Sequence, residues 1–148
     1  MTATRRTRKV SHVSESFRSQ GIMKLLHARI TRVENGFVEI SAKNRAELTQ
    51  QDGLVHAGVL ATLMDSAGGY AVLSLLPPKS RVLAVEFKIN FMRPASGDLI
   101  RGLGKVKRIG KKIAVCELQA TVRKNKAWTS CAWGSQTVYC IRPGDAIG

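Results

Sequence analysis

A long apolar segment constrains the fold of this 148-residue chain more than any other feature. The segment, Val55 to Leu76, has the length of a bilayer crossing, which takes about 20 residues. It carries Asp65 near its middle, however, and a carboxylate at the centre of a membrane helix costs roughly 2.5 to 3.5 kcal/mol. Pro77-Pro78 ends the segment and strand-like sequence follows. We therefore interpret it as a buried helix that begins at His56, and not as a membrane span.

The remaining sequence is typical of an antiparallel sheet. Segments 28–33 and 37–42 flank Glu34-Asn35-Gly36, in which the Asn-Gly pair readily takes the positive φ angles of a tight hairpin turn. After the helix, four segments of alternating character are separated by turn residues: 81–92, 98–109, 112–123 and 127–139. A short amphipathic helix over 14–26, capped by Ser14, precedes the sheet. This order predicts an α+β fold in which one curved antiparallel β-sheet wraps around the long central helix.

The composition fits a single globular domain, with 44% hydrophobic and 23% charged residues. We expect a disordered basic arm over residues 1–13, one domain over 14–142 and a tail over 143–148. The three cysteines show no C-x-x-C spacing, so the sequence predicts neither a disulfide framework nor a metal site. The polar, Arg-rich N-terminus lacks the apolar core of a secretory signal. Together these features predict a cytoplasmic protein.

The chain is strongly basic, with 24 Lys and Arg against 10 Asp and Glu and a formal net charge of +14. An anionic partner is therefore expected: a nucleic acid, an anionic lipid surface or a phosphorylated small molecule. The sequence carries no recognised nucleic-acid motif, so non-specific electrostatic binding is the most that we expect of that class.

Helical geometry separates the two most reactive side chains of the central segment. Asp65 follows His56 by a step of nine residues, which places the two on opposite sides of a helix and about 13.5 Å apart along it. One chain cannot easily bring both to one substrate. Mostly small residues share the helix face of Asp65: Gly58, Ala61, Thr62, Gly68, Gly69 and Val72. The opposite face carries bulkier residues: Leu60, Leu63, Ala67, Tyr70 and Ala71. A nearly bare face admits the close approach of a ligand or a partner backbone.

Taken singly, Asp65 could bond a neighbouring amide and His56 could be structural. The sequence His-Ala-Gly opens the helix, however, and unpaired N–H groups at a helix N-terminus can stabilise a developing oxyanion. The combination indicates acyl transfer.

Two segments carry a family resemblance: GLVHAGVLATLMDSA, from Gly53 to Ala67, and VEFKINFMRPA, from Val85 to Ala95, followed by Gly97-Asp98. They resemble the hotdog-fold acyl-CoA thioesterases of the phenylacetate-degradation (PaaI-like) type over about residues 17 to 139. The resemblance implies a homodimer with a continuous sheet, often paired into a homotetramer, and active sites between two chains. It also implies hydrolysis of acyl-CoA to free acid and CoA, with no cofactor beyond the CoA of the substrate.

The resemblance implies a role for each matching residue. Asp65 would be the catalytic carboxylate, as nucleophile or as general base on water. The amides of Gly58 and Ala57 would polarise the thioester carbonyl from the other subunit. His56 would orient the thioester, and Gln50 would lie near the attacking water.

This chain departs from the family pattern at two positions. Ala57 stands where Gly is usual. Ala84 stands where some members have a Ser or Thr hydroxyl that holds the water.

The phosphates of CoA are anionic groups that the basic residues could bind. The resemblance implies nucleotide contacts from two regions, Arg93-Pro94 and the strand turn around Gly110, and favours Arg93, Arg108 and Lys111. The alternative is that these charges only protect a strand edge from aggregation.

Two hotdog alternatives remain beside the thioesterase. A hydratase of this fold resembles D-x-N-P-x-H, whereas Asp52 and His56 are one residue closer and lack the Asn-Pro. A non-catalytic acyl-CoA-binding protein would keep the pocket and tolerate the loss of Asp65. A basic nucleic-acid-binding module is the less favoured third alternative.

Overall fold

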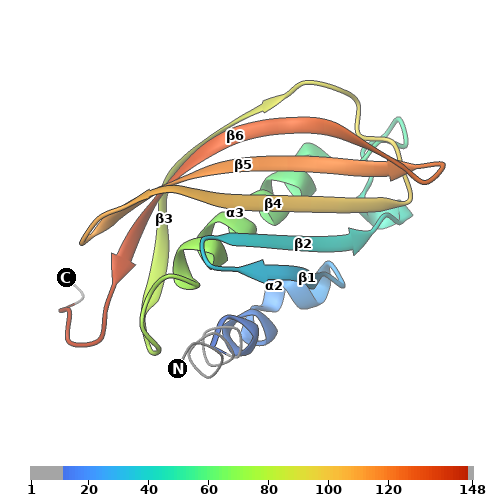
Figure 1. Ribbon diagram of the computed structural model, residues 1–148. Helices are drawn as coiled ribbons and strands as arrows, with labels where there is room; N and C mark the ends of the chain where they lie inside the picture. The colour runs from blue at the N-terminus through green and yellow to red at the C-terminus, as the bar shows by residue number, and fades with distance from the viewer. Residues whose placement is uncertain (1–11, 147–148) are drawn as a thin grey trace.

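The computed structural model describes residues 12–146, and its sheet and long helix form the predicted architecture (Figure 1). Residues 12–19 are helical. The further elements are α2 (Gly21–Leu25), β1 (Arg29–Glu34), β2 (Phe37–Lys43), the 3-10 turn η1 (Ala46–Leu48), α3 (Ala57–Leu73), β3 (Arg81–Phe91), β4 (Leu99–Ile109), β5 (Ile113–Lys124) and β6 (Ala127–Ile141). The six strands form one sheet in the order β1-β2-β4-β5-β6-β3, and each neighbouring pair is antiparallel. The α+β hotdog fold expected from the sequence is confirmed.

The central helix lies against one face of the curved sheet (Figure 1). Alternation along β5 places Cys116, Leu118 and Ala120 on the buried side, as the sequence predicts. Two glycines of β4 permit close contact: a Cβ at Gly102 would lie 2.6 Å from the backbone carbon of Leu63, and one at Gly104 would overlap the backbone of Ala67. The helix can therefore sit directly on the strand, which fixes its position across the sheet.

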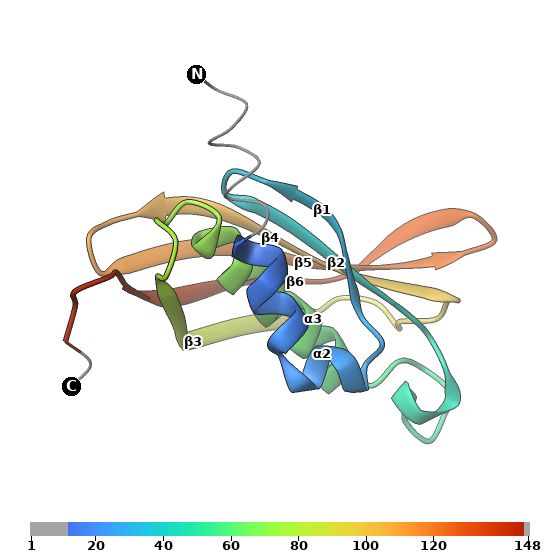
Figure 2. The same ribbon diagram turned by 90° about the horizontal axis from the view of Figure 1, so that it is seen from below.

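The N-terminal helical region differs from the single helix expected over 14–26. The helix is interrupted at Gln20, which separates the helical residues 12–19 from α2. Both helical segments lie beside α3 (Figure 2). Ser14 is not a cap, because residues 12 and 13 are already helical and Val13 is completely buried. The sequence predicts residues 12 and 13 to be part of the disordered basic arm, whereas the structure packs them into the domain. The rest of the predicted arm, residues 1–11, lies outside the described residues.

The end of α3 also differs from the prediction. The helix ends at Leu73, four residues before Pro77. Ser74 follows it and bonds in two directions: its hydroxyl donates to the carbonyl of Ala71 at 2.7 Å and accepts from the Gly36 N–H at 2.8 Å. The hydroxyl thus ties the end of α3 to the β1–β2 turn, in which Gly36 takes a φ of 76°.

The two sheet edges have different character. β1 presents polar and charged side chains, among them Arg29, Arg32 and Glu34, which disfavour strand addition. β3 pairs with β6 on one side only, and its apolar side chains are exposed: Val85 is 57% and Phe87 45% accessible. Within the described residues, β3 is therefore the edge that is suited to a partner strand.

Candidate active site

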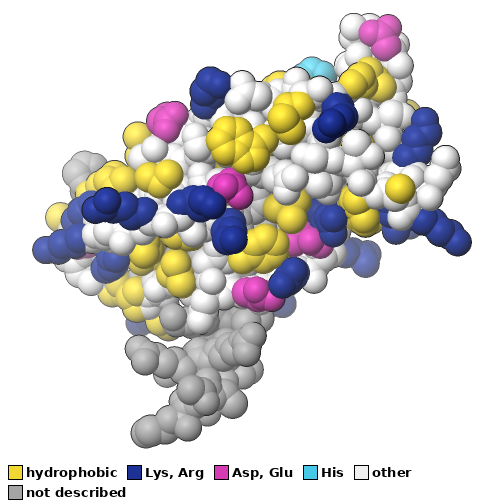
Figure 3. Space-filling model, turned by 45° about the horizontal axis from the view of Figure 1, so that its top comes forward, with side chains coloured by type: hydrophobic (Ala, Val, Ile, Leu, Met, Phe, Trp, Pro, Cys, Tyr) yellow, Lys and Arg dark blue, Asp and Glu magenta, His cyan; other side chains and the backbone are white. Residues whose placement is uncertain are grey.

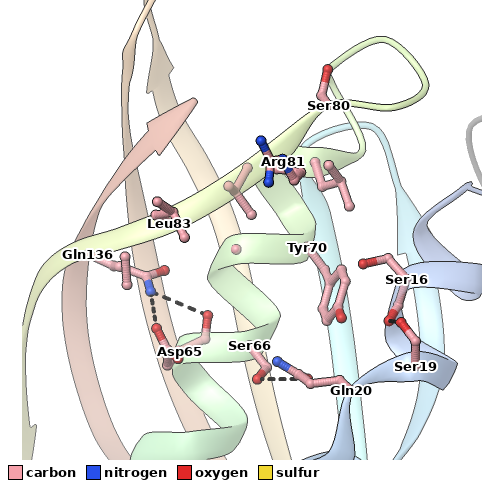
Figure 4. Close-up of a pocket in the computed structure, with 14 residues that line it drawn as sticks. Ser16, Ser19, Gln20, Asp65, Ser66, Tyr70, Ser80, Arg81, Leu83 and Gln136 are labelled. Carbon is pink, nitrogen blue, oxygen red and sulfur yellow. Dashed lines mark hydrogen bonds between the residues drawn. The ribbon is translucent and has the colours of Figure 1, made fainter. Parts of the chain in front are cut away.

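A cavity of about 380 Å³ opens between α3, the N-terminal helix and the first half of β3 (Figure 4). Asp65 lies on its wall, together with Ala84 of β3 and Gln136 of β6. Other polar side chains of the lining come from the N-terminal helix and α3: Ser16, Ser19, Gln20, Ser66 and Tyr70. Ser80 and Arg81 line it at the start of β3, so the cavity combines one carboxylate and one guanidinium group with several neutral hydrogen-bonding groups.

The Asp65 carboxylate is held by a single amide. Gln136 Nε2 donates to Asp65 Oδ1, and also lies 3.3 Å from the backbone oxygen of the same residue (Figure 4). Burial raises the pKa of Asp65, because the charged form loses water, and the hydrogen bond from Gln136 opposes this by favouring the ionised form. A carboxylate with a raised pKa in a cavity is typical of a general base.

The raised pKa predicts how stability depends on pH. A carboxyl group that holds its proton more tightly in the folded state supports folding at pH values below its unfolded pKa of 3.8. That contribution is lost as pH rises through the folded pKa, so ionised Asp65 destabilises the fold at neutral pH. We expect Asp65→Asn to melt at a higher temperature than wild type at pH 7 and at nearly the same temperature at pH 3.5, as measured by calorimetry. A lower melting temperature at pH 7 would contradict this prediction.

His56 caps the N-terminus of α3. Its Nδ1 accepts a hydrogen bond from the Gly58 N–H at 2.8 Å. An accepting Nδ1 requires the neutral tautomer with the proton on Nε2, so the ring presents an Nε2–H donor. His56, Ala57 and Gly58 are all exposed. The amide of Gly58, expected to stabilise an oxyanion, is therefore bonded to His56 in this structure, and the imidazole must turn or share that hydrogen when a carbonyl oxygen approaches.

The structure does not bring all the predicted catalytic residues together in one chain. The cavity around Asp65 is lined by neither His56 nor Gly58, in the part of the chain that the structure describes. Gln50 is at the His56 end as well: it is bonded to Asp52 through both its amide oxygen and its Nε2. The separation expected from the helical spacing is thus present in the fold.

The predicted nucleotide contacts are separated too. Arg93 Nη1 donates to the carbonyl of Ser130, near the start of β6, whereas Arg142 Nη2, just past its end, donates to the carbonyl of Gly110. Ser130 and Arg142 are about 40 Å apart along an extended strand. One chain therefore places Arg93-Pro94 and the Gly110 turn at opposite ends of β6, and it cannot by itself bring both regions to one nucleotide.

The basic residues of β4 and the following turn divide into two groups. Three are ion-paired: Arg101 with Glu39 at 3.1 Å, Lys107 with Glu117 at 3.0 Å and Lys112 with Asp145 at 2.9 Å. Arg108 and Lys111 are exposed and form no ion pair within residues 12–146. Lys and Arg side chains are spread among hydrophobic ones on the surface in Figure 3. Lys105 is likewise exposed without an ion pair within residues 12–146, so the unpaired side chains Lys105, Arg108 and Lys111 are the better candidates for a phosphate.

Gln136 is the functional candidate that sequence reasoning missed. It is 1% exposed and interrupts an inner face that otherwise carries small and apolar residues: Ala132, Gly134, Val138 and Cys140. The sequence does contain a signal for this residue: a single amide side chain at an inward-facing position of a predicted strand. The helix face of Asp65 is less open than the sequence predicts, because Gly68 and Val72 are buried in the core. The other small residues of that face are at least partly accessible, as expected: Gly58, Ala61, Thr62 and Gly69.

This site and fold can be compared with those of known proteins. The sequence matches the thioesterase superfamily over residues 52–128, which include His56, Gly58 and Asp65. The chain belongs to the thioesterase superfamily. A thioesterase family protein of Silicibacter pomeroyi is 34% identical, with a TM-score of 0.88 over 90% of this chain and 98% of the other. The PaaI protein of Escherichia coli, from the phenylacetic acid degradation operon, has a TM-score of 0.80 over 96% of this chain and 98% of its own, at 21% identity.

Two sequence relatives of this superfamily member agree with that assignment. A Halobacterium salinarum protein whose name describes it provisionally as an esterase is 31% identical over 72% of this chain and 74% of its own length. A protein of Escherichia coli named as a medium/long-chain acyl-CoA thioesterase, YigI, is 22% identical over 65% of this chain and 72% of its own. The expected resemblance is confirmed for the superfamily, and the fold is the one that PaaI shares.

Three further features concern the described residues alone. None of the helices within 12–146 combines the length and the apolarity that a bilayer crossing requires. No cluster of three or more potential metal ligands occurs there. Cys116, Cys131 and Cys140 are free and buried, and burial raises the pKa of Cys116 to about 12.

Proposed function

We propose that this thioesterase-superfamily protein hydrolyses acyl-CoA thioesters to a free acid and CoA in active sites shared by two chains. The observation that carries the proposal is the half-buried Asp65 carboxylate in a cavity beside the open apolar edge of β3, at the middle of α3 and about 13.5 Å along the helix from His56. Each chain thus holds two half-sites that are separated along one helix.

Strand pairing supports the way in which the half-sites would meet. Antiparallel pairing of two β3 strands about a twofold axis sets the Arg81 end of one strand beside the Phe91 end of the other. The Asp65 cavity lies at the first end, lined by residues 80–84. The start of α3 lies at the second, because the Val55 N–H donates to the carbonyl of Ala95 at 2.9 Å. A dimer of this kind would bring Asp65 of one chain toward His56 and Gly58 of its partner.

The same pairing accounts for the separated basic residues. The Gly110 turn lies at the Arg81 end of the sheet, since Arg81 pairs with Ile141 and Arg142 bonds Gly110. Arg93 lies at the Phe91 end of the other chain. Arg108 and Lys111 of one protomer and Arg93 of its partner would then border one site, where they would bind the phosphates of CoA.

The proposed chemistry uses groups on the chain and water, with no metal or redox cofactor. The partner's Gly58 amide and the Nε2–H of His56 would donate to the thioester carbonyl oxygen as negative charge develops on it. Asp65 would act on the acyl carbon, directly or through water. The carbon–sulfur bond breaks, and CoA leaves as a thiolate that takes up a proton. Ala84 borders the cavity beside Asp65 without a hydroxyl, so the departure noted in the sequence lies at the site itself.

The buried, reduced cysteines fit a cytoplasmic protein, and they also simplify the assay. Purified protein would be incubated with a panel of short-chain, medium-chain and aryl acyl-CoA substrates, with CoA release followed by a thiol reagent. Because all three cysteines are buried with raised pKa values, the folded protein should contribute little background. Release of CoA from at least one class supports the proposal; absence of release from all of them contradicts it.

A further inference from the structure

Gln136 has an amide whose two ends differ in their surroundings. Its Nε2 donates to Asp65, whereas its Oε1 is buried and has no hydrogen-bond partner among the described residues. The orientation is determined chemically, since a carboxylate accepts hydrogen bonds only and would repel the carbonyl end of the amide. Gln136 therefore holds a buried acceptor oxygen beside the carboxylate, and the residue lines the same cavity (Figure 4).

The position of this amide is rigid. Gln136 lies on the inner face of β6, between Cys116 of β5 and Phe87 of β3 in the sheet register. Its side chain occupies the space left by Gly68: a Cβ there would overlap Oε1 and lie 3.2 Å from Cδ of Gln136. A side chain enclosed by a helix and two neighbouring strands has little freedom to turn, so the acceptor oxygen stays in place without a ligand.

A buried acceptor without a partner destabilises a protein unless a donor reaches it. The reacting end of a thioester offers a carbonyl oxygen and a sulfur, both of which accept hydrogen bonds and neither of which donates. Water donates two. A molecule bonded both to Gln136 Oε1 and to Asp65 is therefore expected to be water and not the acyl group.

We propose that Gln136 and Asp65 together hold the attacking water, Gln136 Oε1 accepting one of its hydrogens and the Asp65 carboxylate the other. This inference rests on the proposed thioesterase function and deepens it, because it assigns Asp65 the role of general base instead of nucleophile. Gln136 is then a positioning residue for Asp65, through Nε2, and a catalytic residue for water, through Oε1. Gln136 lies outside residues 52–128, the segment that matches the superfamily.

The step balances without any further reactant. The water oxygen forms a bond to the acyl carbon as one of its protons moves to Asp65. The carbon–sulfur bond of the tetrahedral intermediate breaks, and the departing CoA thiolate takes the proton back from Asp65. Gln136 neither gains nor loses a proton, and its Nε2 keeps one carboxylate oxygen engaged while the other faces the water.

The first test replaces Gln136 with Met, which keeps the volume and removes both hydrogen bonds. We expect kcat to fall roughly 10- to 100-fold, less than for loss of the base itself, with KM changed by less than about threefold. The acidic limb of the kcat/KM profile should move to higher pH, because the donor that favours ionised Asp65 is gone. Gln119→Met is the matched control: this glutamine is on the outer sheet face, bonded to Ser130, and its loss should leave the limb in place.

Few other ionisable groups face this carboxylate. The titratable or charged side chains that line the cavity besides Asp65 are Tyr70 on α3 and Arg81 on β3, while the N-terminal helix contributes Ser16, Ser19 and Gln20. Burial raises the pKa of Tyr70, which therefore stays neutral across the acidic limb. In the proposed dimer His56 of the partner subunit also faces this site, so a shift of the limb is assigned to Asp65 when Gln136→Met moves it in a variant that also carries His56→Gln.

A second variant keeps the test decisive if Gln136→Met folds poorly. Gln136→Glu preserves the shape, and its protonated carboxyl can still donate to Asp65. We expect it to retain activity at mildly acidic pH and to lose it as pH rises, since two adjacent carboxylates cannot both ionise easily. A profile with the wild-type shape for either folded variant would overturn the role of Gln136.

A single-turnover experiment in H₂¹⁸O, with enzyme in excess, tests the chemical step. If water attacks the acyl carbon, the first acid formed carries one ¹⁸O. If Asp65 attacks, an anhydride between the acyl group and Asp65 forms first: water that opens it at the Asp65 carbon gives a ¹⁶O acid and a labelled Asp65 carboxylate, and an anhydride that opens at the acyl carbon is detected as an acyl adduct of Asp65 after a rapid acid quench. Either result overturns the inference while leaving thioester hydrolysis intact. Failure of the proposed function is distinguishable, because the wild-type protein then releases no CoA from any member of the panel; that result overturns the inference as well.

Discussion

Asp65→Asn is expected to lower kcat for acyl-CoA hydrolysis by at least a hundredfold, within the range of about 10² to 10⁴ for loss of a general base. The substitution keeps the size of the side chain, and its amide oxygen can still accept from Gln136 Nε2. What it removes is the group that takes a proton from water. Steady-state CoA release by the variant and by wild type measures the effect directly.

The control for this prediction is another aspartate. Asp98 is exposed, and its carboxylate bonds Arg123 at 2.8 Å outside the Asp65 cavity. Asp98→Asn is expected to change kcat by less than about threefold, because a surface ion pair of this kind contributes little. Binding of CoA, measured by calorimetry, should be similar for wild type and Asp65→Asn. Unchanged turnover in Asp65→Asn would refute the catalytic assignment of this carboxylate, whereas CoA binding without any turnover by wild type would favour the non-catalytic acyl-CoA-binding protein.

The second large effect is expected at the open edge of β3. Val85→Lys with Phe87→Lys places like charges at the centre of a strand pair that would otherwise be apolar, and lysine on an edge strand opposes pairing. We expect a monomer that retains its fold and loses at least about 99% of its activity, since each site needs groups from two chains. Light scattering after size-exclusion chromatography, together with CoA release, measures both consequences.

A matched pair of substitutions on the outer sheet face isolates the contribution of the edge. Ile113 and Val115 of β5 are exposed apolar residues like those of β3, with accessibilities of 44% and 37%. Ile113→Lys with Val115→Lys should leave the dimer and its activity intact; if wild type is a tetramer that associates through this face, the product is an active dimer. A fully active monomer from the β3 variant would contradict the shared site.

Much of the fold was predictable from the sequence, because it depends on local patterns. The apolar alternation of β5, the Asn-Gly hairpin and the long segment with Asp65 each report on one element, and the structure reproduces each within a few residues. The errors arose where contacts between residues far apart in the sequence determine the local structure. α3 stops at Leu73 because Ser74 is bonded to a distant turn, and Val13 is ordered because it packs into the core.

The site was harder to predict for the same reason. Asp65 and His56 could be found from one helix, and their separation followed from its geometry. Gln136 is 71 residues from Asp65 in the sequence, and only the sheet register brings the two together. The separation of the basic residues could not be predicted, because sequence proximity does not determine the end of the sheet at which a turn lies: Arg93 and Gly110 contact opposite ends of β6.

The most direct measurement of the central claim mixes two inactive variants with defects in different half-sites. Asp65→Asn removes the carboxylate, and Gly58→Pro removes the N–H at the start of α3, where proline is tolerated. Gly58→Ala, which keeps the N–H, controls for the added side chain. When the two inactive proteins are unfolded together and refolded, half of the dimers are mixed, and each mixed dimer has one intact site.

Recovery of about a quarter of the wild-type rate in the mixture, from two parents that are each at least a hundredfold impaired, is the result expected for sites that join Asp65 of one chain to Gly58 of its partner. Activity of the mixture that stays at the level of its parents, although mixed dimers have formed, would contradict the shared site.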